Sequence, residues 1–133
     1  MKKAQKAIGA TMAALALSIY GATSASAGGW DYLGSSYFHW KPTSGSYLTA
    51  SFKSAGGYFK ICTTYDSPKA KYTIWEYDPD SSDEWVGSYT LGSDACATLN
   101  VQGVVDGDNK RAELYVATTN EAVGHNEYIT FYD

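Results

Sequence analysis

Short segments in which apolar and polar residues alternate recur from residue 36 to residue 132, separated by clusters of Gly, Pro, Asp, Asn and Ser. Alternation of period two places successive side chains on opposite faces of a strand, and this arrangement is typical of a sandwich or barrel. The region is also rich in Tyr, Trp, Thr and Val, which favour pleated sheets. The predicted strands cover residues 36–40, 46–53, 57–65, 71–77, 85–91, 95–105, 111–118 and 127–132. We therefore predict an all-β fold, an antiparallel β-sandwich of about eight strands, with a small β-barrel as the alternative.

Two of these strands show which faces we expect to be buried. In the predicted strand 46–53, the core positions are Leu48, Ala50 and Phe52, and in the strand 111–118 they are Ala112, Leu114 and Val116. The alternate positions, including Tyr47, Thr49, Ser51 and Lys53, face solvent. One-sided patterns of this kind are typical of antiparallel sheets with one face in water.

The first 27 residues have the three parts of a secretory signal peptide. Three lysines lie among residues 2–6, an apolar stretch follows over 7–21, and Ala-Ser-Ala at 25–27 forms a small-x-small cleavage site. The apolar stretch is too short and too diluted by polar residues to span a bilayer permanently. We therefore predict that residues 1–27 are a cleaved signal peptide and that residues 28–133 form a single β-sandwich domain, secreted to the extracellular space.

The sequence also lacks the features that would hold such a domain at a membrane. A lipoprotein carries a Cys directly after the cleavage site, whereas the first Cys here is Cys62. The sequence closes on Phe131, Tyr132 and Asp133 rather than on a hydrophobic tail. We therefore expect a released, monomeric domain with no stable membrane anchor.

Removal of the signal peptide makes the remaining domain strongly acidic. It would contain 106 of the 133 residues, with 7 of the 10 Lys and Arg against all 14 Asp and Glu, so its net charge would be −7. An acidic domain without a basic cluster repels phosphate backbones, so we expect no nucleic-acid partner. The length fits a single domain with one core.

The two cysteines, Cys62 and Cys96, favour one intramolecular disulfide, because a lone pair in a small exported domain meets an oxidising environment. Alternation places Cys62 on the face opposite to Ile61, and Cys96 on the face opposite to Ala97. The bond should therefore link two strands across an outer face or near a sheet edge. A redox or metal site is the alternative, although neither Cys has another Cys or a His at ligand spacing.

Residues that could carry catalysis are few. His39 and His125 are the two histidines of the chain, and with Glu121 or Glu127 they could bind zinc or act as an acid–base pair. The carboxylates that could converge for glycoside hydrolysis are Glu76, Glu84 and Glu113. No HExxH, GxSxG or glycine-rich phosphate loop accompanies them. The sequence therefore favours a non-enzymatic protein and identifies no catalytic residue, although it leaves an enzyme open.

Two acidic loops could bind calcium, which prefers several oxygen ligands from one loop. The first contains Asp78, Asp80 and Asp83, and we place the candidate metal site there. The second contains Asp106, Asp108 and Asn109. Neither loop has the full EF-hand spacing, and the same residue types are common in hairpin turns. No other cofactor is expected.

Aromatic residues are the most informative candidates for ligand binding. With Tyr72 and Ile74 in the core, alternation turns Trp75 and Tyr77 outward as a stripe. The candidate ligand-binding residues are Trp75, Tyr77, Trp85 and Trp40. Exposed Trp and Tyr provide rigid contact area at low entropic cost, which suits the recognition of sugars and proteins.

We therefore predict a small secreted binding protein that grips an extracellular glycan, a cell-wall polymer or a protein through exposed aromatic residues. The alternative is a secreted enzyme inhibitor or antagonistic effector that acts on another protein. In that case, the determinant would lie on a loop such as 78–84 or 119–126, held rigid by the sandwich.

Overall fold

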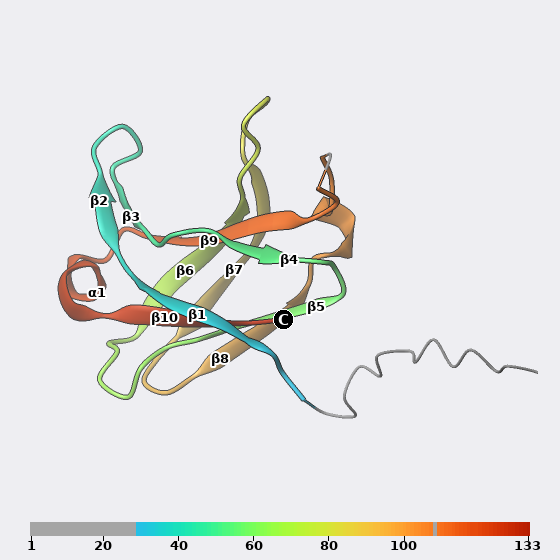
Figure 1. The fold of residues 1–133 in the computed structure, drawn as a ribbon. Helices are drawn as coiled ribbons and strands as arrows, with labels where there is room; N and C mark the ends of the chain where they lie inside the picture. Colours follow the sequence, from blue (N-terminus) through green and yellow to red (C-terminus); the bar gives the residue numbers. More distant parts are fainter. Residues whose placement is uncertain (1–28, 108) are drawn as a thin grey trace, which may run out of the picture.

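The computed structural model describes residues 29–107 and 109–133, which form two antiparallel β-sheets packed face to face (Figure 1). This confirms the predicted antiparallel sandwich, whereas the predicted signal peptide at 1–27 lies outside the described residues. The strands are β1 (Tyr32–Tyr37), β2 (His39–Lys41), β3 (Ser46–Leu48), β4 (Phe52–Ser54), β5 (Tyr58–Cys62), β6 (Ala70–Glu76), β7 (Glu84–Leu91), β8 (Cys96–Asn100), β9 (Ala112–Thr118) and β10 (Tyr128–Tyr132). Two short helices accompany them, a 3₁₀ turn η1 (Gln102–Val104) and α1 (Glu121–Asn126).

The smaller sheet has the strand order β1-β10-β5-β8, and the larger one has the order β2-β3-β9-β6-β7, with β4 also paired to β9. The chain crosses from the smaller to the larger sheet between β1 and β2, where Phe38 is buried. The predicted strand 36–40 is therefore the junction of two strands in different sheets. The predicted strand 95–105 ends at Asn100, and α1 was not predicted.

The predicted strand 46–53 is interrupted in the structure, and half of its predicted facing is wrong. Tyr47 and Thr49 are buried and Ala50 is exposed, whereas Phe52 packs against the core as expected. The backbone N–H of Thr49 donates to Val116, but the N–H of Ala50 donates to the Ser36 hydroxyl in the other sheet. The chain thus leaves β9 after residue 49 and rejoins it at residue 52, which shifts the alternation by one residue.

The core lies between the two sheets and confirms the predicted facing of strand 111–118. Ala112, Leu114 and Val116 are fully buried, and they pack with side chains of the smaller sheet. The Phe52 ring stacks on that of Phe131, with 4.3 Å between ring centroids. The largest fully buried side chains are Tyr72, Phe59, Phe131, Ile61, Ile74, Leu114 and Ile129.

The predicted disulfide between Cys62 and Cys96 is present. The two residues lie directly opposite each other on β5 and β8, with 4.1 Å between their Cα atoms. Their neighbours Ile61 and Ala97 are buried, so the bond lies on the outer face of the smaller sheet, at its β8 edge. This is the placement that the alternation predicted.

The ends of the described chain lie side by side. Asp31 and Asp133 exchange two backbone hydrogen bonds of 3.0 Å, which extend the β1–β10 ladder. The Asp133 carboxylate also accepts a 2.5 Å hydrogen bond from the Ser54 hydroxyl. Within the described part of the chain, no helix has the length and hydropathy needed to cross a membrane.

Candidate functional site

Three aromatic residues form a row across the outer face of the larger sheet. Trp75 on β6 lies opposite Trp85 on β7 and opposite Tyr115 on β9. Its neighbours Ile74 and Glu76 are buried, so alternation turns Trp75 outward, as predicted. We call Trp85, Trp75 and Tyr115 the aromatic row.

A β-bulge in β7 brings Trp85 into this row. Gly87 pairs with Ile74 but Trp85 pairs with Trp75, so Val86 is an extra residue between them. The bulge shifts Trp85 onto the face of Trp75. Without it, regular alternation would have turned Trp85 and Gly87 the same way.

Hydrogen bonds fix the two ends of the row. Trp85 is 60% exposed, and its indole N–H donates to the Ser88 hydroxyl at 3.1 Å. The half-buried Tyr115 donates its hydroxyl hydrogen to Asp83 at 2.5 Å. Burial raises the pKa of Tyr115, and the Asp83 carboxylate raises it further, so the phenol keeps its proton. Hydrogen bonds thus hold the two outer rings of the row in place.

A hollow of about 260 Å³ adjoins the row on the same sheet. Trp75 lines it together with polar residues that include Lys71, Thr73 and Thr119. The complete lining is Ser46, Lys71, Thr73, Trp75, Ala117, Thr118 and Thr119. An aromatic wall beside several donors and acceptors suits a ligand with both apolar and hydroxyl-bearing faces.

The other two candidate residues lie outside the row. Tyr77 follows β6 by one residue, is 44% exposed and lines a separate acidic hollow. Trp40 is 53% exposed but lies on β2, where it packs against Tyr47 with 4.9 Å between ring centroids. The structure therefore brings Trp75 and Trp85 together and leaves Trp40 apart.

The two histidines share an open hollow of about 760 Å³ with Trp40 and Glu121. The His125 ring lies edge-on to Tyr47, with 5.7 Å between ring centroids. Glu127 lies apart from them and accepts hydrogen bonds from Thr64 and Ser67. Among the described residues, the histidines do not join a group of three potential metal ligands.

The first acidic loop projects beyond the sheets at the top of Figure 1, where the chain is yellow-green. Its carboxylates accept hydrogen bonds within or beside the loop: Asp78 from Ser81 at 2.6 Å and Asp83 from the N–H of Asp78 at 3.2 Å. These hydrogen bonds, first of all that from Ser81, lower the pKa of Asp78.

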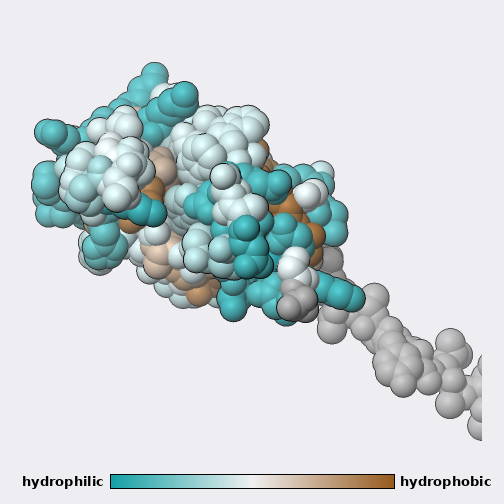
Figure 2. Space-filling model, turned by 90° about the horizontal axis from the view of Figure 1, so that it is seen from above, coloured by the Kyte–Doolittle hydropathy of each residue, from teal (hydrophilic) through white to brown (hydrophobic). Residues whose placement is uncertain are grey.

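Seen from above in Figure 2, the molecule is mostly hydrophilic or pale, with hydrophobic residues in small separate areas.

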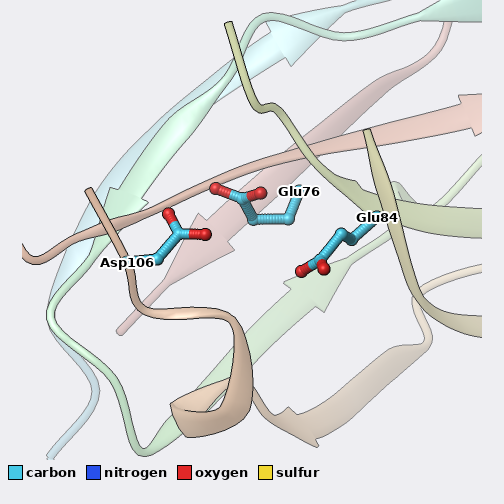
Figure 3. A group of neighbouring side chains, drawn as sticks. All are labelled: Glu76, Glu84 and Asp106. Carbon is cyan, nitrogen blue, oxygen red and sulfur yellow. The ribbon is translucent and has the colours of Figure 1, made fainter. Parts of the chain in front are cut away.

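A different set of carboxylates converges beside this loop. One oxygen each from Glu76, Glu84 and Asp106 lies within 4.8 Å of the other two, and the three side chains point into one space (Figure 3). Glu76 is only 1% exposed. Burial raises the pKa of Glu76 to about 7, and the negative charges of Asp106, Asp78 and Glu84 add to this effect.

A second aromatic surface lies on the outer face of the smaller sheet, and the sequence indicated the aromatic residues near the start of the domain but not their partners. Rings pair across β1 and β10, Tyr32 with Tyr132 at 5.9 Å and Tyr37 with Tyr128 at 5.4 Å between centroids. The Lys60 ammonium group lies 4.5 Å from the centroid of the Tyr132 ring. Alternation over 127–132 could have indicated two of these tyrosines, but strand pairing brings the others to them.

Fold and site together define a disulfide-linked antiparallel β-sandwich with aromatic residues on its outer faces. Residues 32–131 match the model of the family described as the YndA coiled coil domain, and the chain belongs to this family. The described residues of that range form strands and two helices of three and six residues. This member therefore folds as a sandwich and not as the coiled coil of the description. No curated protein matches the chain.

Several solved structures of family 29 carbohydrate-binding modules are similar to this chain. One mutant module has 15% sequence identity and a TM-score of 0.36, with 79% of each chain covered. Another, complexed with cellulohexaose, has 14% identity and a TM-score of 0.34, covering 80% of this chain and 78% of that one. A third module has 14% identity and a TM-score of 0.35, covering 80% and 76%. These values are too low to transfer binding residues or ligands to this chain.

Proposed function

We propose that the domain is a non-enzymatic binding protein that grips a glycan or cell-wall polymer with its aromatic row. The observation that supports this function is the register of three strands, which places Trp85, Trp75 and Tyr115 side by side on one outer face. A row with a 60% exposed Trp at its end leaves apolar surface in contact with water.

The row suits a sugar ring for a physical reason. One face of a pyranose carries mainly C–H groups, and a Trp or Tyr ring offers it a flat apolar surface with a negative face. Two interstrand spacings make the row about 10 Å wide, which is longer than one sugar ring. The row therefore fits neighbouring units of a polymer better than a single monosaccharide.

The adjoining hollow would supply the polar contacts. A ligand stacked on Trp75 has its edge toward Lys71, Thr73 and Thr119, which line the hollow. Hydroxyl and ammonium groups can hydrogen-bond sugar hydroxyls, and a few such groups fix the orientation of a ligand. Export by the predicted signal peptide at 1–27 would bring the domain to extracellular glycans.

The test measures retention of the purified protein on insoluble polysaccharides and on peptidoglycan. We expect Trp75→Ala and Trp85→Ala each to weaken retention by about tenfold or more, which is the effect of truncating an aromatic residue that carries much of the binding energy. Trp40→Ala is the matched control, because Trp40 is similarly exposed but lies outside the row. Thermal melting of each variant checks that it is folded.

Retention that is absent in the wild type, or equal in all three variants, would contradict the proposal. Loss confined to Trp40→Ala would move the site to the hollow that contains the two histidines.

One observation favours a protein-directed function as the second candidate. The loop at 78–83 projects beyond the sheets, and its own hydrogen bonds hold its shape, as a rigid inhibitory loop requires (Figure 1). Inhibition of one enzyme in a protease and glycosidase panel, abolished by replacing residues 79–82 with a short Gly-Ser turn, would favour this candidate over the glycan.

A further inference from the structure

We infer that Glu76, Glu84 and Asp106 form a binding site for a hard divalent cation, and that the ion is calcium. The inference concerns the end of the sandwich from which the 78–83 loop projects and is independent of the proposed glycan-binding row.

Three separate elements bring these carboxylates together. Glu76 ends β6 and Glu84 begins β7, where the two residues are cross-strand partners. Asp106 comes from the turn before β9 and is held there by an isolated bridge to Arg111. Register and turn, rather than local sequence spacing, therefore place three carboxylate oxygens within 4.8 Å of one another (Figure 3).

An orphaned buried oxygen points independently to a missing partner. The Glu76 side chain is 1% exposed, and its Oε2 has no hydrogen-bond partner in the structure. Its Oε1 accepts one long hydrogen bond of 3.4 Å from the N–H of Glu113. A buried polar oxygen without a partner is costly, and a buried carboxylate even more so. A cation bound between the three carboxylates would supply that partner.

The charged groups around the three carboxylates favour the binding of a cation. Among the described residues, the one ion pair within 4.0 Å is Lys53–Glu113, so no Lys or Arg forms a salt bridge with the three carboxylates. Glu76 and Asp106 line a hollow of about 270 Å³, whose lining also includes Asp78, Asp80, Asn109 and one cation, Arg111. Water and the remaining oxygens of this hollow would complete the coordination shell.

The ligand chemistry and spacing favour calcium. All three ligands are carboxylate oxygens, which suit hard cations, whereas zinc sites use His and Cys. Oxygens on opposite sides of a calcium ion lie about 4.6–5.2 Å apart, whereas those around magnesium lie about 4.0–4.2 Å apart. Oxygen–oxygen distances within 4.8 Å accommodate calcium, and a set of three carboxylates exceeds the one or two through which magnesium is usually bound.

This site differs from the one predicted at Asp78, Asp80 and Asp83. Oxygens of Asp78 and Asp83 already accept hydrogen bonds from loop residues and from Tyr115. The inferred site takes one ligand from the second predicted loop, Asp106, and two from the ends of the hairpin that carries the first loop.

The test titrates the chelator-treated full chain with calcium chloride by calorimetry and follows thermal unfolding with and without the metal. We expect saturable binding, and a rise in Tm of roughly 5 °C or more at calcium concentrations far above Kd. Magnesium should bind at least about tenfold more weakly.

Three variants locate the site. Glu76→Gln and Glu84→Gln should each lower calcium affinity by about tenfold or more, because each removes a charged ligand. Glu121→Gln, which removes the same charge from an exposed glutamate on α1, should leave the affinity unchanged. Glu84 is exposed, so its replacement tests binding even if a change at Glu76 disturbs folding.

The inference is overturned if calcium at 1 mM neither binds nor raises the Tm of the wild type, or if Glu84→Gln and Glu121→Gln bind calcium alike. It is also overturned if Asp78→Asn abolishes binding that Glu84→Gln retains, because the ligands would then be those of the loop. Retention on glycans is a separate readout, so failure here leaves the proposed function standing.

Discussion

At the scale of single residues, Glu76 is the position where the fold and electrostatics conflict most. Alternation along β6 turns its side chain into the sandwich, in line with Tyr72 and Ile74. A carboxylate there is far from water and close to other negative charges, and these conditions disfavour its ionised form. A carboxylate at this position lowers the stability of the fold, and a bound ion or ligand can offset that cost.

Glu76 should make the calcium-free protein less stable as pH rises. Because its pKa is about 7 in the folded state and 4.5 in the reference state, the contribution of Glu76 to stability is greatest below pH 4.5 and is lost as pH rises from 4.5 to about 7. The total loss from this group is on the order of 3 kcal/mol. Urea unfolding of the wild type in EDTA at pH 5 and pH 8 should show this loss.

Glu76→Gln is the control for that pH effect, because glutamine has nearly the same shape and does not ionise. The variant should be more stable than the wild type at pH 8 in EDTA, and its difference between the two pH values should be smaller. An equal pH dependence in both proteins would mean that another group is responsible.

At Gly124, close packing against Tyr47 leaves no room for a side chain. A Cβ atom at this position would lie 2.4 Å from the ring of the buried Tyr47. Gly124→Ala should therefore lower the free energy of unfolding by roughly 1–3 kcal/mol. Gly103→Ala is the matched control, since nothing lies within 4 Å of its Cβ position, and chemical denaturation should show little change for it. Similar losses in both variants would contradict the packing argument.

At the scale of elements, the sequence pattern was reliable where a strand runs without interruption. Strands β6 and β9 alternate regularly, so the buried Leu114 and the outward Trp75 could be predicted. Alternation failed over 46–53, because the hydroxyl of Thr49 accepts the hydrogen bond from the N–H of Val116. A side chain there replaces a ladder carbonyl, and no hydrophobic pattern encodes that exchange.

The candidate site was predicted only in part for a related reason. The outward facing of Trp75 follows from its own strand, but Tyr115 joins it through a pairing between residues 40 positions apart in the sequence. The carboxylates of Glu76, Glu84 and Asp106 likewise meet through strand register and a turn. Local patterns predict which way a side chain faces, whereas its neighbours depend on topology.

The disulfide joins β5 directly to β8, which is an edge strand with one neighbour, so loss of the bond should affect this strand pair first. The Cys62–Cys96 bond closes a separation of 34 residues, which is worth roughly 4 kcal/mol in the chain-entropy model. The double substitution of both cysteines by alanine should lower stability by about 2–4 kcal/mol.

Hydrogen exchange should show where that loss falls. Amides of β8 that face β5, such as those of Ala97 and Leu99, should exchange faster in the double variant, whereas those in the middle of β9 should remain protected until global unfolding. Uniform acceleration in both sheets would contradict a local role for the disulfide.

At the scale of the whole molecule, the two sheets have different tasks in the proposed function. The larger sheet carries the aromatic row and, at one end, Glu76 and Glu84, beside which Asp106 lies in the turn before β9. Glu76 and Glu84 directly adjoin Trp75 and Trp85 in the sequence, so a bound ion and a bound glycan would act on the same hairpin from opposite faces. The smaller sheet packs behind it and supplies Phe59 and Phe131 to the shared core.

The double hydrogen bond between Asp31 and Asp133 has a mechanical consequence. Tension applied between these two residues would load the antiparallel β1–β10 ladder across its strands, so its hydrogen bonds would open one after another and not together. The Cys62–Cys96 bond would then exclude the segment between the cysteines from extension, and that segment includes Trp75 and Trp85. Under such tension the terminal strands β1 and β10 would separate at low force. The loop closed by the disulfide would keep the β6–β7 hairpin, which carries Trp75 and Trp85, from being stretched.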